Sequence, residues 1–357
     1  MKNKLKLNKK EYIHPIISFF IGIIFTFIII IPIAEVFLLK NNLTINIKNK
    51  TKIYEKSSLS NSIKKIYDSV ISIELDNNNS SSGTGFIYKT DNKYAYILTN
   101  EHVINSAKKI EVIFSNKKEA KAKLLGSDAY LDIAVLRIDK KYSSLVATLG
   151  NSNNLNLGDT IFTVGTPVDI EYQGTITSGI ISGKDRKVEA NINNYSEEKE
   201  IMDMIQIDSP INSGNSGGPL VNINGEVVGI CTLKISEQDV ESMGFAIPIN
   251  NIKKYLKTLE KGKNIAWPTM GIEVEDLNNY EENIKGVKIT KVEKNSVGDK
   301  ANLEEGDIIT KIGNKKITDS LTYIYELYKY KAGNNIEISY IRNKNKKTCK
   351  ITLASYK

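Results

Sequence analysis

Short apolar runs rich in β-branched and aromatic residues recur through the middle of the chain, each separated from the next by polar turn residues. The runs are VISIEL, YAYILT, IEVIF, IAVLRI, GTITSGIIS and EVVGICT, which begin at Val70, Tyr94, Ile110, Ile133, Gly174 and Glu226. A parallel α/β fold would require a helical pattern between its strands, and no such pattern lies between these runs. The pattern predicts a mostly β fold, either a barrel or a sandwich.

A helical pattern begins near Asn250 and stops at Gly262. Its apolar positions, spaced for one helix face, are Ile252, Tyr255, Leu256 and Leu259. This helix is expected to close the first folded unit, which we place at residues 61–262.

A second strand-rich unit is predicted at residues 266–357, after the short connection Lys261 to Ala266. It contains one amphipathic helix, which Asp319 or Ser320 could cap at its start and Gly333 at its end. The apolar face of this helix comprises Leu321, Ile324, Tyr325 and Tyr328.

The N-terminal segment has a different character, because twenty consecutive residues from Pro15 to Ala34 carry no charge and are nearly all apolar. As a helix they would span roughly 30 Å, the thickness of a bilayer core. A buried helix of a soluble protein would show a polar face, and a cleaved signal peptide would have a shorter apolar run and a small-x-small cleavage site. We therefore predict a transmembrane anchor over residues 15–39, followed by a polar linker over residues 40–60.

Charge gives this predicted anchor an orientation. The net charge is +8, and the first fourteen residues carry five lysines against Glu11. Because positively charged flanks stay in the cytoplasm, residues 1–14 are expected to form a cytoplasmic tail and everything after Lys40 to lie outside. The excess charge after residue 40 is too diffuse to indicate a nucleic-acid partner.

The two cysteines, Cys231 and Cys349, fall in different predicted domains. A structural disulfide is not expected, so the exported part must be stabilised by core burial.

The sharpest chemical signal is the hexapeptide GNSGGP, which runs from Gly214 to Pro219. A serine hydroxyl becomes a nucleophile only when a base removes its proton, and the oxyanion that it creates needs fixed donors. Glycines around Ser216 would let the backbone turn sharply, so the predicted oxyanion hole comprises Gly214, Asn215 and Ser216. The plain alternative is a glycine-rich β-turn with an incidental serine.

The base for such a serine is limited by the two histidines of the chain. His14 abuts the predicted anchor on its cytoplasmic side, which leaves His102 as the imidazole of the exported part. His102 follows an apolar run, and the end of a strand could present it to a cleft. A lone surface or capping histidine is the alternative.

A carboxylate must then hold the imidazole in the correct tautomer. Asp132 fits best, because it begins the apolar run at Ile133 and would lie on a well-packed strand. Asp128 is the competitor, and a solvated aspartate at a strand end is the unremarkable alternative. The order His102, Asp132, Ser216 is that of chymotrypsin-like proteases.

The sequence segments around these residues point to a family more specifically than the three residues do. The segments TNEHV, DIAVL, GTITSGIIS, NSGNSGGPL and GFAIPIN together resemble the HtrA/Deg family over about residues 60–357. The resemblance implies a chymotrypsin-like double β-barrel, ATP-independent cleavage of unfolded or misassembled proteins, and usually a homotrimer. It implies no metal and no organic cofactor, and no Walker-type glycine loop is present.

Some positions depart from the family. Ser213 stands where the family commonly has proline, and Cys231 where it often has asparagine, beside the expected specificity pocket. No charged residue marks the expected pocket floor at Pro210, which favours small aliphatic residues before the cleaved bond. Residues 76–82 form a short loop where some relatives have a long one, whereas residues 184–200 resemble the family's sensing loop in position.

The C-terminal unit resembles a PDZ domain at TMGI (Thr269, Met270, Gly271 and Ile272), GVKI and ANLEEGDII. The TMGI turn would offer N–H groups to a peptide carboxylate, and the following strand edge would accept the peptide as an added strand. A packing domain without a ligand is the alternative.

The expected function is that of a membrane-anchored, extracytoplasmic serine endopeptidase in envelope quality control or stress signalling. Its expected partners are unfolded proteins, C-terminal peptides and the membrane. A proteolytically silent PDZ scaffold is the alternative from another class, and a serine–lysine hydrolase is a third hypothesis.

Overall fold

The computed structural model describes residues 13–33, 35–36, 59–75, 82–105, 107–167, 169–191, 199–232, 243–277 and 284–355. Most of the predicted cytoplasmic tail, most of the linker, and residues 76–81 of the predicted short loop lie outside the described residues. The chain divides into two units, Met1–Ser58 and Leu59–Lys357.

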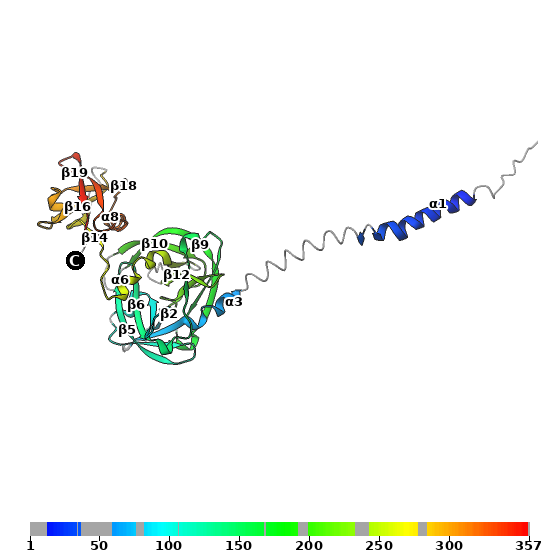
Figure 1. Ribbon diagram of the computed structural model, residues 1–357. Coiled ribbons are helices and arrows are strands. Elements are labelled where there is room, and N and C mark those ends of the chain that lie inside the picture. Colours follow the sequence, from blue (N-terminus) through cyan, green and yellow to red (C-terminus); the bar gives the residue numbers. More distant parts are fainter. Residues whose placement is uncertain are drawn as a thin grey trace, which may run out of the picture. The chain divides into compact units, whose positions relative to one another are not determined.

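The first unit contains the helix α1 (Ile13–Phe25), followed by the π-helical turn η1 (Thr26–Ile30) (Figure 1). Its side chains from Phe19 to Ile33 are exposed. Within the described residues, no helix combines the length and the apolar character that crossing a bilayer needs. The prediction of one transmembrane helix over residues 15–39 is therefore not supported by these helices.

The second unit begins with a closed antiparallel barrel. Its strands follow the order β1-β2-β3-β6-β5-β4, with bounds β1 Val70–Leu75, β2 Ser82–Thr90, β3 Tyr94–Thr99, β4 Ile110–Phe114, β5 Glu119–Asp128 and β6 Ile133–Asp139. Isoleucines from several strands fill its interior, among them the fully buried Ile71, Ile73 and Ile97. The short helix α4 (Glu101–Ile104) leaves the barrel directly after β3.

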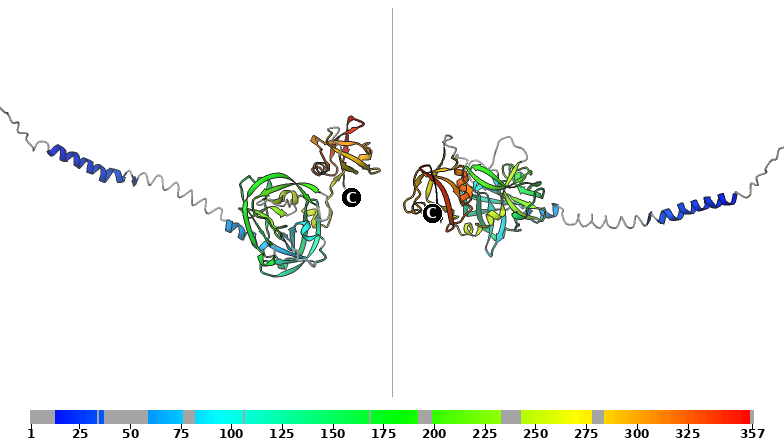
Figure 2. Two further views of the ribbon diagram at one scale, coloured as in Figure 1. Left: turned by 180° about the vertical axis from the view of Figure 1, so that it is seen from behind. Right: turned by 90° about the horizontal axis from the view of Figure 1, so that it is seen from above.

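A second barrel follows, in the order β11-β8-β9-β10-β13-β12, and pairing of β11 with β12 closes it, with β7 at its side. The bounds are β7 Thr148–Leu149, β8 Thr160–Gly165, β9 Thr175–Asn191, β10 Lys199–Ile207, β11 Pro219–Asn222, β12 Glu226–Thr232 and β13 Gly244–Pro248. Figure 2 gives two further views of these curved strands. The prediction of a mostly β, double-barrel fold is confirmed.

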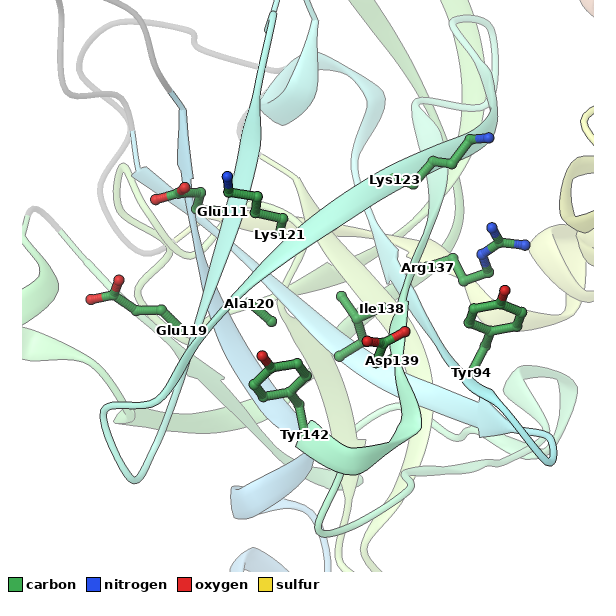
Figure 3. A pocket seen from close by; sticks show the side chains of 10 residues that line it. All are labelled: Tyr94, Glu111, Glu119, Ala120, Lys121, Lys123, Arg137, Ile138, Asp139 and Tyr142. Atoms are coloured by element: carbon green, nitrogen blue, oxygen red, sulfur yellow. The ribbon is translucent and has the colours of Figure 1, made fainter.

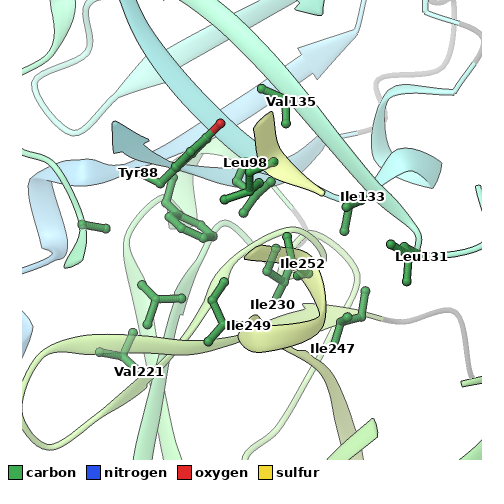
Figure 4. Packing of buried hydrophobic residues seen from close by; sticks show 14 of the residues in the cluster. Tyr88, Leu98, Leu131, Ile133, Val135, Val221, Ile230, Ile247, Ile249 and Ile252 are labelled. Atoms are coloured by element: carbon green, nitrogen blue, oxygen red, sulfur yellow. The ribbon is translucent and has the colours of Figure 1, made fainter. Parts of the chain in front are cut away.

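One apolar core joins the two barrels. It contains Phe86 and Leu98 from the first barrel, and Phe162 and Ile230 from the second. Figure 4 shows Leu98, Val135, Ile230, Ile247 and Ile252 within this cluster. Because the barrels share buried surface, residues at their seam are held from both sides.

Two segments differ in structure from the sequence prediction. The helix expected from Asn250 to Gly262 is two short helices, α5 (Ile249–Lys253) and α6 (Leu256–Glu260), because Tyr255 bonds back only three residues, to Ile252. The segment 184–200 is largely a hairpin of β9 and β10 rather than a loop, with Met202 paired to Val188. Residues 192–198 of that segment lie outside the described residues.

The C-terminal region is a sheet of order β15-β16-β17-β19-β20, with β18 paired to β17 and a small β14–β21 pair. The bounds are β14 Pro268–Thr269, β15 Ile272–Asp276, β16 Val287–Val292, β17 Ile308–Ile312, β18 Lys315–Lys316, β19 Asn335–Arg342, β20 Asn345–Thr352 and β21 Ala354–Ser355. Its helices are α7 (Val297–Lys300) and α8 (Ser320–Leu327). Asp319, not Ser320, caps α8 by accepting a 2.7 Å hydrogen bond from the N–H of Thr322.

Short helical turns complete the described structure. They are α3 (Leu59–Lys64), η2 (Tyr67–Ser69), η3 (Lys140–Tyr142), η4 (Ser152–Asn154) and η5 (Ile170–Tyr172). Trp267, at the start of the C-terminal region, donates its indole N–H to Asp128 over 2.9 Å and stacks on Tyr328, with ring centroids 4.6 Å apart.

Candidate active site

The first barrel brings His102 and Asp132 together. Pairing of β3 with β6 sets Thr99 opposite Ala134, so the residues that follow β3 lie beside those that precede β6. The His102 Nδ1 atom lies 2.9 Å from both carboxylate oxygens of Asp132, and the backbone N–H of His102 donates to Oδ1 over 3.1 Å. The imidazole is partly exposed, whereas the Asp132 side chain is fully buried.

The Asp132 carboxylate is further held by the second barrel. The Thr232 hydroxyl, on β12, donates to Oδ2 over 3.0 Å, and Asn100 Nδ2 donates to the Asp132 carbonyl over 2.7 Å. Asp132 has a positive φ of 51°, a conformation that costs a non-glycine residue free energy and often occurs at functional sites.

The competitor, Asp128, has another role in the described structure. Its carboxylate accepts hydrogen bonds from the backbone N–H of Leu131 and from the Trp267 indole. Asp128 therefore closes the turn that leads into Asp132, and Asp132 is the carboxylate that faces the imidazole.

Ser216 lies in the loop between β10 and β11, at the seam between the barrels, and is buried. Its carbonyl accepts a hydrogen bond from the N–H of Thr84, on β2 of the first barrel, over 2.9 Å. On the other side, the N–H of Gly217 donates to the carbonyl of Cys231 on β12 over 3.0 Å. The serine loop is thus attached to both barrels.

Two glycines make this close approach possible. Gly214 and Gly217 have φ values of 98° and 82°, which favour glycine. A Cβ atom at Gly217 would collide with the Thr84 carbonyl and the Thr99 hydroxyl, and Thr99 ends the strand that leads to His102. The glycine therefore lets the serine loop lie directly against the segment that carries the imidazole.

The backbone donors of the serine loop are not equivalent. The N–H of Asn215 donates to the Asn212 carbonyl over 3.0 Å, so it stabilises the loop itself. The Gly214 carbonyl accepts a 2.6 Å hydrogen bond from the Thr84 hydroxyl, which fixes the peptide plane between Gly214 and Asn215. The same hydroxyl accepts from the N–H of Thr166, so Thr84 ties the serine loop to the end of β8.

The positions that depart from the family lie around this loop. Ser213 is exposed immediately before Gly214, and Pro210 is exposed at the loop's start. Cys231 is completely buried next to Thr232, and burial raises the pKa of its thiol to about 12. Burial therefore favours the protonated form of the Cys231 thiol near neutral pH.

The part of the chain that the structure describes contains no group of three or more His, Cys, Asp or Glu side chains suited to hold a metal. A separate cavity of about 510 Å³ on the first barrel contains none of the three triad residues (Figure 3). Its charged lining residues have both signs: Lys121, Lys123, Arg137, Glu111, Glu119 and Asp139.

In the C-terminal region, the TMGI turn precedes an edge strand. Gly271 has a φ of 68°, and its N–H donates to the Thr269 hydroxyl over 3.0 Å. Met270 is fully buried, whereas Ile272 begins β15, which pairs only with β16 among the described strands. The turn is thus followed by a strand with one edge that no described strand covers, while the Gly271 N–H is used within the turn itself.

Sequence reasoning missed Thr84 and Thr232. Both lie in short β-like segments whose patterns show only a strand, and their roles come from hydrogen bonds to residues 130 and 100 positions away. No local signal in the sequence identifies such partners.

Comparison with known proteins agrees with this geometry. Residues 83–230 match the trypsin-like peptidase domain, and residues 268–353 match the PDZ domain. The class is therefore a trypsin-like peptidase domain followed by one PDZ domain.

Relatives narrow the class to a family. The chain is 38% identical over 302 residues to the serine protease Do-like HtrA of Bacillus subtilis (strain 168), covering 81% of this chain and 67% of that protein. It is 37% identical over 284 residues to the serine protease Do-like HtrB of the same organism, covering 76% of this chain and 61% of the relative. The chain belongs to the HtrA/Do-like family of serine proteases, and it spans about three fifths to two thirds of the length of these two relatives.

Solved structures similar to this chain include an HtrA-type protease and a serine endoprotease. The HtrA-type protease AlgW with a decapeptide has a TM-score of 0.65 and 26% identity, covering 84% of this chain and 99% of that one. The serine endoprotease from Yersinia pestis has a TM-score of 0.63 and 30% identity, with the same coverage.

Proposed function

We propose that the protein is a serine endopeptidase in which Ser216 is the nucleophile, His102 the general base and Asp132 the residue that orients the base. The observation that carries the proposal is the contact of His102 Nδ1 with both oxygens of a fully buried carboxylate. Because the carboxylate keeps the proton on Nδ1, Nε2 remains unprotonated and can accept the proton of the serine hydroxyl. The Thr232 hydroxyl supports this arrangement by holding the same carboxylate.

The reaction follows from these roles. Ser216 Oγ attacks the substrate carbonyl while His102 takes its proton, and the negative charge develops on the carbonyl oxygen. The N–H groups of Gly214 and Ser216 are proposed as its donors, since the N–H of Asn215 is used within the loop. His102 then donates the proton to the leaving amine, and water releases the acyl group by the reverse sequence of steps.

The proposed substrates are unfolded or misassembled proteins, cleaved without ATP and with a preference for small aliphatic residues before the cleaved bond. The proposed partners of the PDZ domain are C-terminal peptides, bound at residues 269–272 and along the edge of β15 that no described strand covers. In support, structures of the HtrA-type protease AlgW with a decapeptide and with a tripeptide are among the structural relatives. A homotrimer is part of the proposal, by resemblance to the family.

Membrane anchoring and an extracytoplasmic location complete the proposal. Their support is the uncharged run from Pro15 to Ala34 and the lysine-rich flank before it. Fractionation should find the full chain with membranes, and external protease should degrade the part after Lys40 in intact spheroplasts. Protection of that part would show the topology to be wrong.

The function is tested with an unfolded protein as substrate, compared between the wild-type chain and Ser216→Ala. Cleavage by the wild type alone supports the endopeptidase, whereas binding without cleavage by either would favour the silent PDZ scaffold. A serine-directed fluorophosphonate should label the wild type and not the variant.

A further inference from the structure

A second groove lies on the PDZ domain, away from the proposed C-terminal peptide site. Its volume is about 770 Å³, within the range of about 300–1,000 Å³ that is common for ligand sites. We call it the lysine groove, after the five lysines among its lining residues: Lys285, Lys311, Lys316, Lys346 and Lys347.

The lysine groove runs across the outer face of the sheet. On β19, Ile338 and Tyr340 are buried in the domain core, whereas the alternate residues Ser339 and Ile341 are half-buried and line the groove. Lys311 on β17 pairs with Ser339, and Lys346 on β20 pairs with Ile341. The groove therefore lies over β17, β19 and β20, whereas β15 is at the other end of the sheet.

Among the described lining residues, the charge of this groove is unbalanced. None of them is acidic, and none of the five lysine side chains forms an ion pair or hydrogen bond with a described residue. Other lysines of the domain are paired: Lys288 with Glu275 at 3.0 Å and Lys291 with Glu273 at 2.5 Å. Neighbouring unpaired charges of one sign repel one another, and an anionic ligand would relieve that repulsion.

The floor of the groove is apolar. Ile284 and Ile341 contribute half-buried side chains to it, whereas Ile317 and Tyr340, which also line the groove, are almost completely buried in the domain core. A polymer of phosphate groups would leave this floor unused, and a flat lipid surface would not enter a concave groove. An extended chain that carries both carboxylates and apolar side chains complements the lysines and the floor together.

We propose that the lysine groove binds an extended acidic segment of unfolded polypeptide that also carries apolar side chains. It would act as a second substrate contact on the PDZ domain, a role that rests on the proposed function. In this arrangement the lysines contact the acidic side chains and the floor contacts the apolar ones, so neither feature alone defines the ligand.

The binding test uses the full chain with Ser216→Ala in neutral detergent and a fluorescent acidic peptide that contains leucines. An amidated C-terminus removes the carboxylate on which the β15 site depends. Fluorescence anisotropy should detect binding, and Lys311→Gln with Lys347→Gln should weaken it about fivefold to tenfold, as expected for the loss of two exposed ion pairs. The matched control, Lys288→Gln with Lys291→Gln, removes the same charge from the same domain and should leave the affinity nearly unchanged.

Several results would overturn the proposal. Equal weakening by both pairs of substitutions would indicate general charge attraction, and displacement by an apolar peptide with a free carboxylate would indicate the β15 site. If a peptide of equal charge with serines in place of leucines, or polyphosphate, bound as tightly, the groove would be a site for any polyanion. If the acidic peptide does not bind while the wild type cleaves unfolded protein, the proposal for the lysine groove alone is contradicted. If the wild type does not cleave unfolded protein, the proposed function is contradicted.

Discussion

Asp132 shows how one residue of the site depends on distant parts of the chain. Its carboxylate contacts His102, thirty residues before it, and Thr232, one hundred residues after it. Its backbone adopts a positive φ that an aspartate does not favour. The first barrel must therefore be folded before this carboxylate and the imidazole can meet, and the second barrel must be in place before Thr232 can hold the same carboxylate.

Removing the imidazole tests the triad most directly. His102→Ala should lower kcat/KM at least about 10⁴-fold, because the variant loses the proposed general base that takes the serine proton. Peptidase assays give the rate, and circular dichroism with thermal unfolding checks that the fold is retained. If the folded variant keeps more than a small fraction of wild-type activity, His102 is not the base, and a lysine base would then be the next hypothesis.

Thr84 provides a test of the oxyanion loop. Thr84→Val removes the hydroxyl that holds the Gly214 carbonyl and accepts from Thr166, so we expect kcat to fall about tenfold while KM changes little. Thr84→Ser keeps the hydroxyl and should recover most of the rate. Equal activity of the two variants would contradict a positioning role for the hydroxyl.

At the scale of the element, the helix α8 depends on its first-turn contacts. The Asp319 carboxylate accepts from the N–H of Thr322, and the Thr322 hydroxyl accepts from the N–H of Asp319 in return. Partial burial opposes ionisation of Asp319, but hydrogen bonds from Thr318 and Thr322 outweigh it and hold the pKa below its usual value. The folded state therefore favours the ionised carboxylate.

This cap should be measurable. Asp319→Ala should destabilise the protein by about 1 kcal/mol at neutral pH, the usual cost of losing a helix cap, whereas Asp319→Ser should lose little. Because the pKa is lower in the folded state, the contribution of the ionised cap is present above the unfolded pKa of about 4 and is lost as the pH falls through the folded value. Urea unfolding at neutral and acidic pH measures both effects, and a pH-independent difference would contradict the ionised cap.

The elements also explain one difference from the sequence prediction. The apolar positions 252, 256 and 259 are buried as the helical pattern predicts, yet the helix is interrupted at Tyr255. The three-residue hydrogen bond there lets both short helices contribute to the core between the barrels, together with strands of each barrel.

At the scale of the whole molecule, the active site forms where the two barrels meet. The serine loop is bonded to Thr84 on one side and Cys231 on the other. The PDZ domain is connected to this arrangement through Trp267, which contacts Asp128 in the turn before Asp132 and stacks on Tyr328 after α8.

Deleting residues 266–357 tests what the PDZ domain contributes. Loss of a sensor should change the basal kcat, whereas loss of a substrate tether should mainly raise KM. In the first case, a short peptide with an apolar C-terminus should raise cleavage of an unrelated reporter by the full chain. The size of this activation is limited by the difference in the peptide's affinity for the two states of the protease. If deletion and peptide both leave every kinetic parameter unchanged, the domain is neither a sensor nor a tether.

The sequence by itself determined the β-rich class and the residue types of the proposed triad, and it predicted the division into units at 61–262 and 266–357. These features depend on neighbouring residues: apolar alternation, glycines at a sharp turn and a histidine at the end of a strand all act locally. The predicted membrane anchor likewise came from a local apolar run, and the helices that the structure describes there do not support it.

Only the tertiary structure decided that Asp132 rather than Asp128 faces the imidazole, and that Thr84 and Thr232 hold the site. It also decided that five lysines from four separate segments border one groove. The physical reason is that these contacts join residues far apart in the chain, brought together by burial of shared apolar surface and by strand register. Neither the burial of shared apolar surface nor the strand register can be inferred from a residue's neighbours in the sequence.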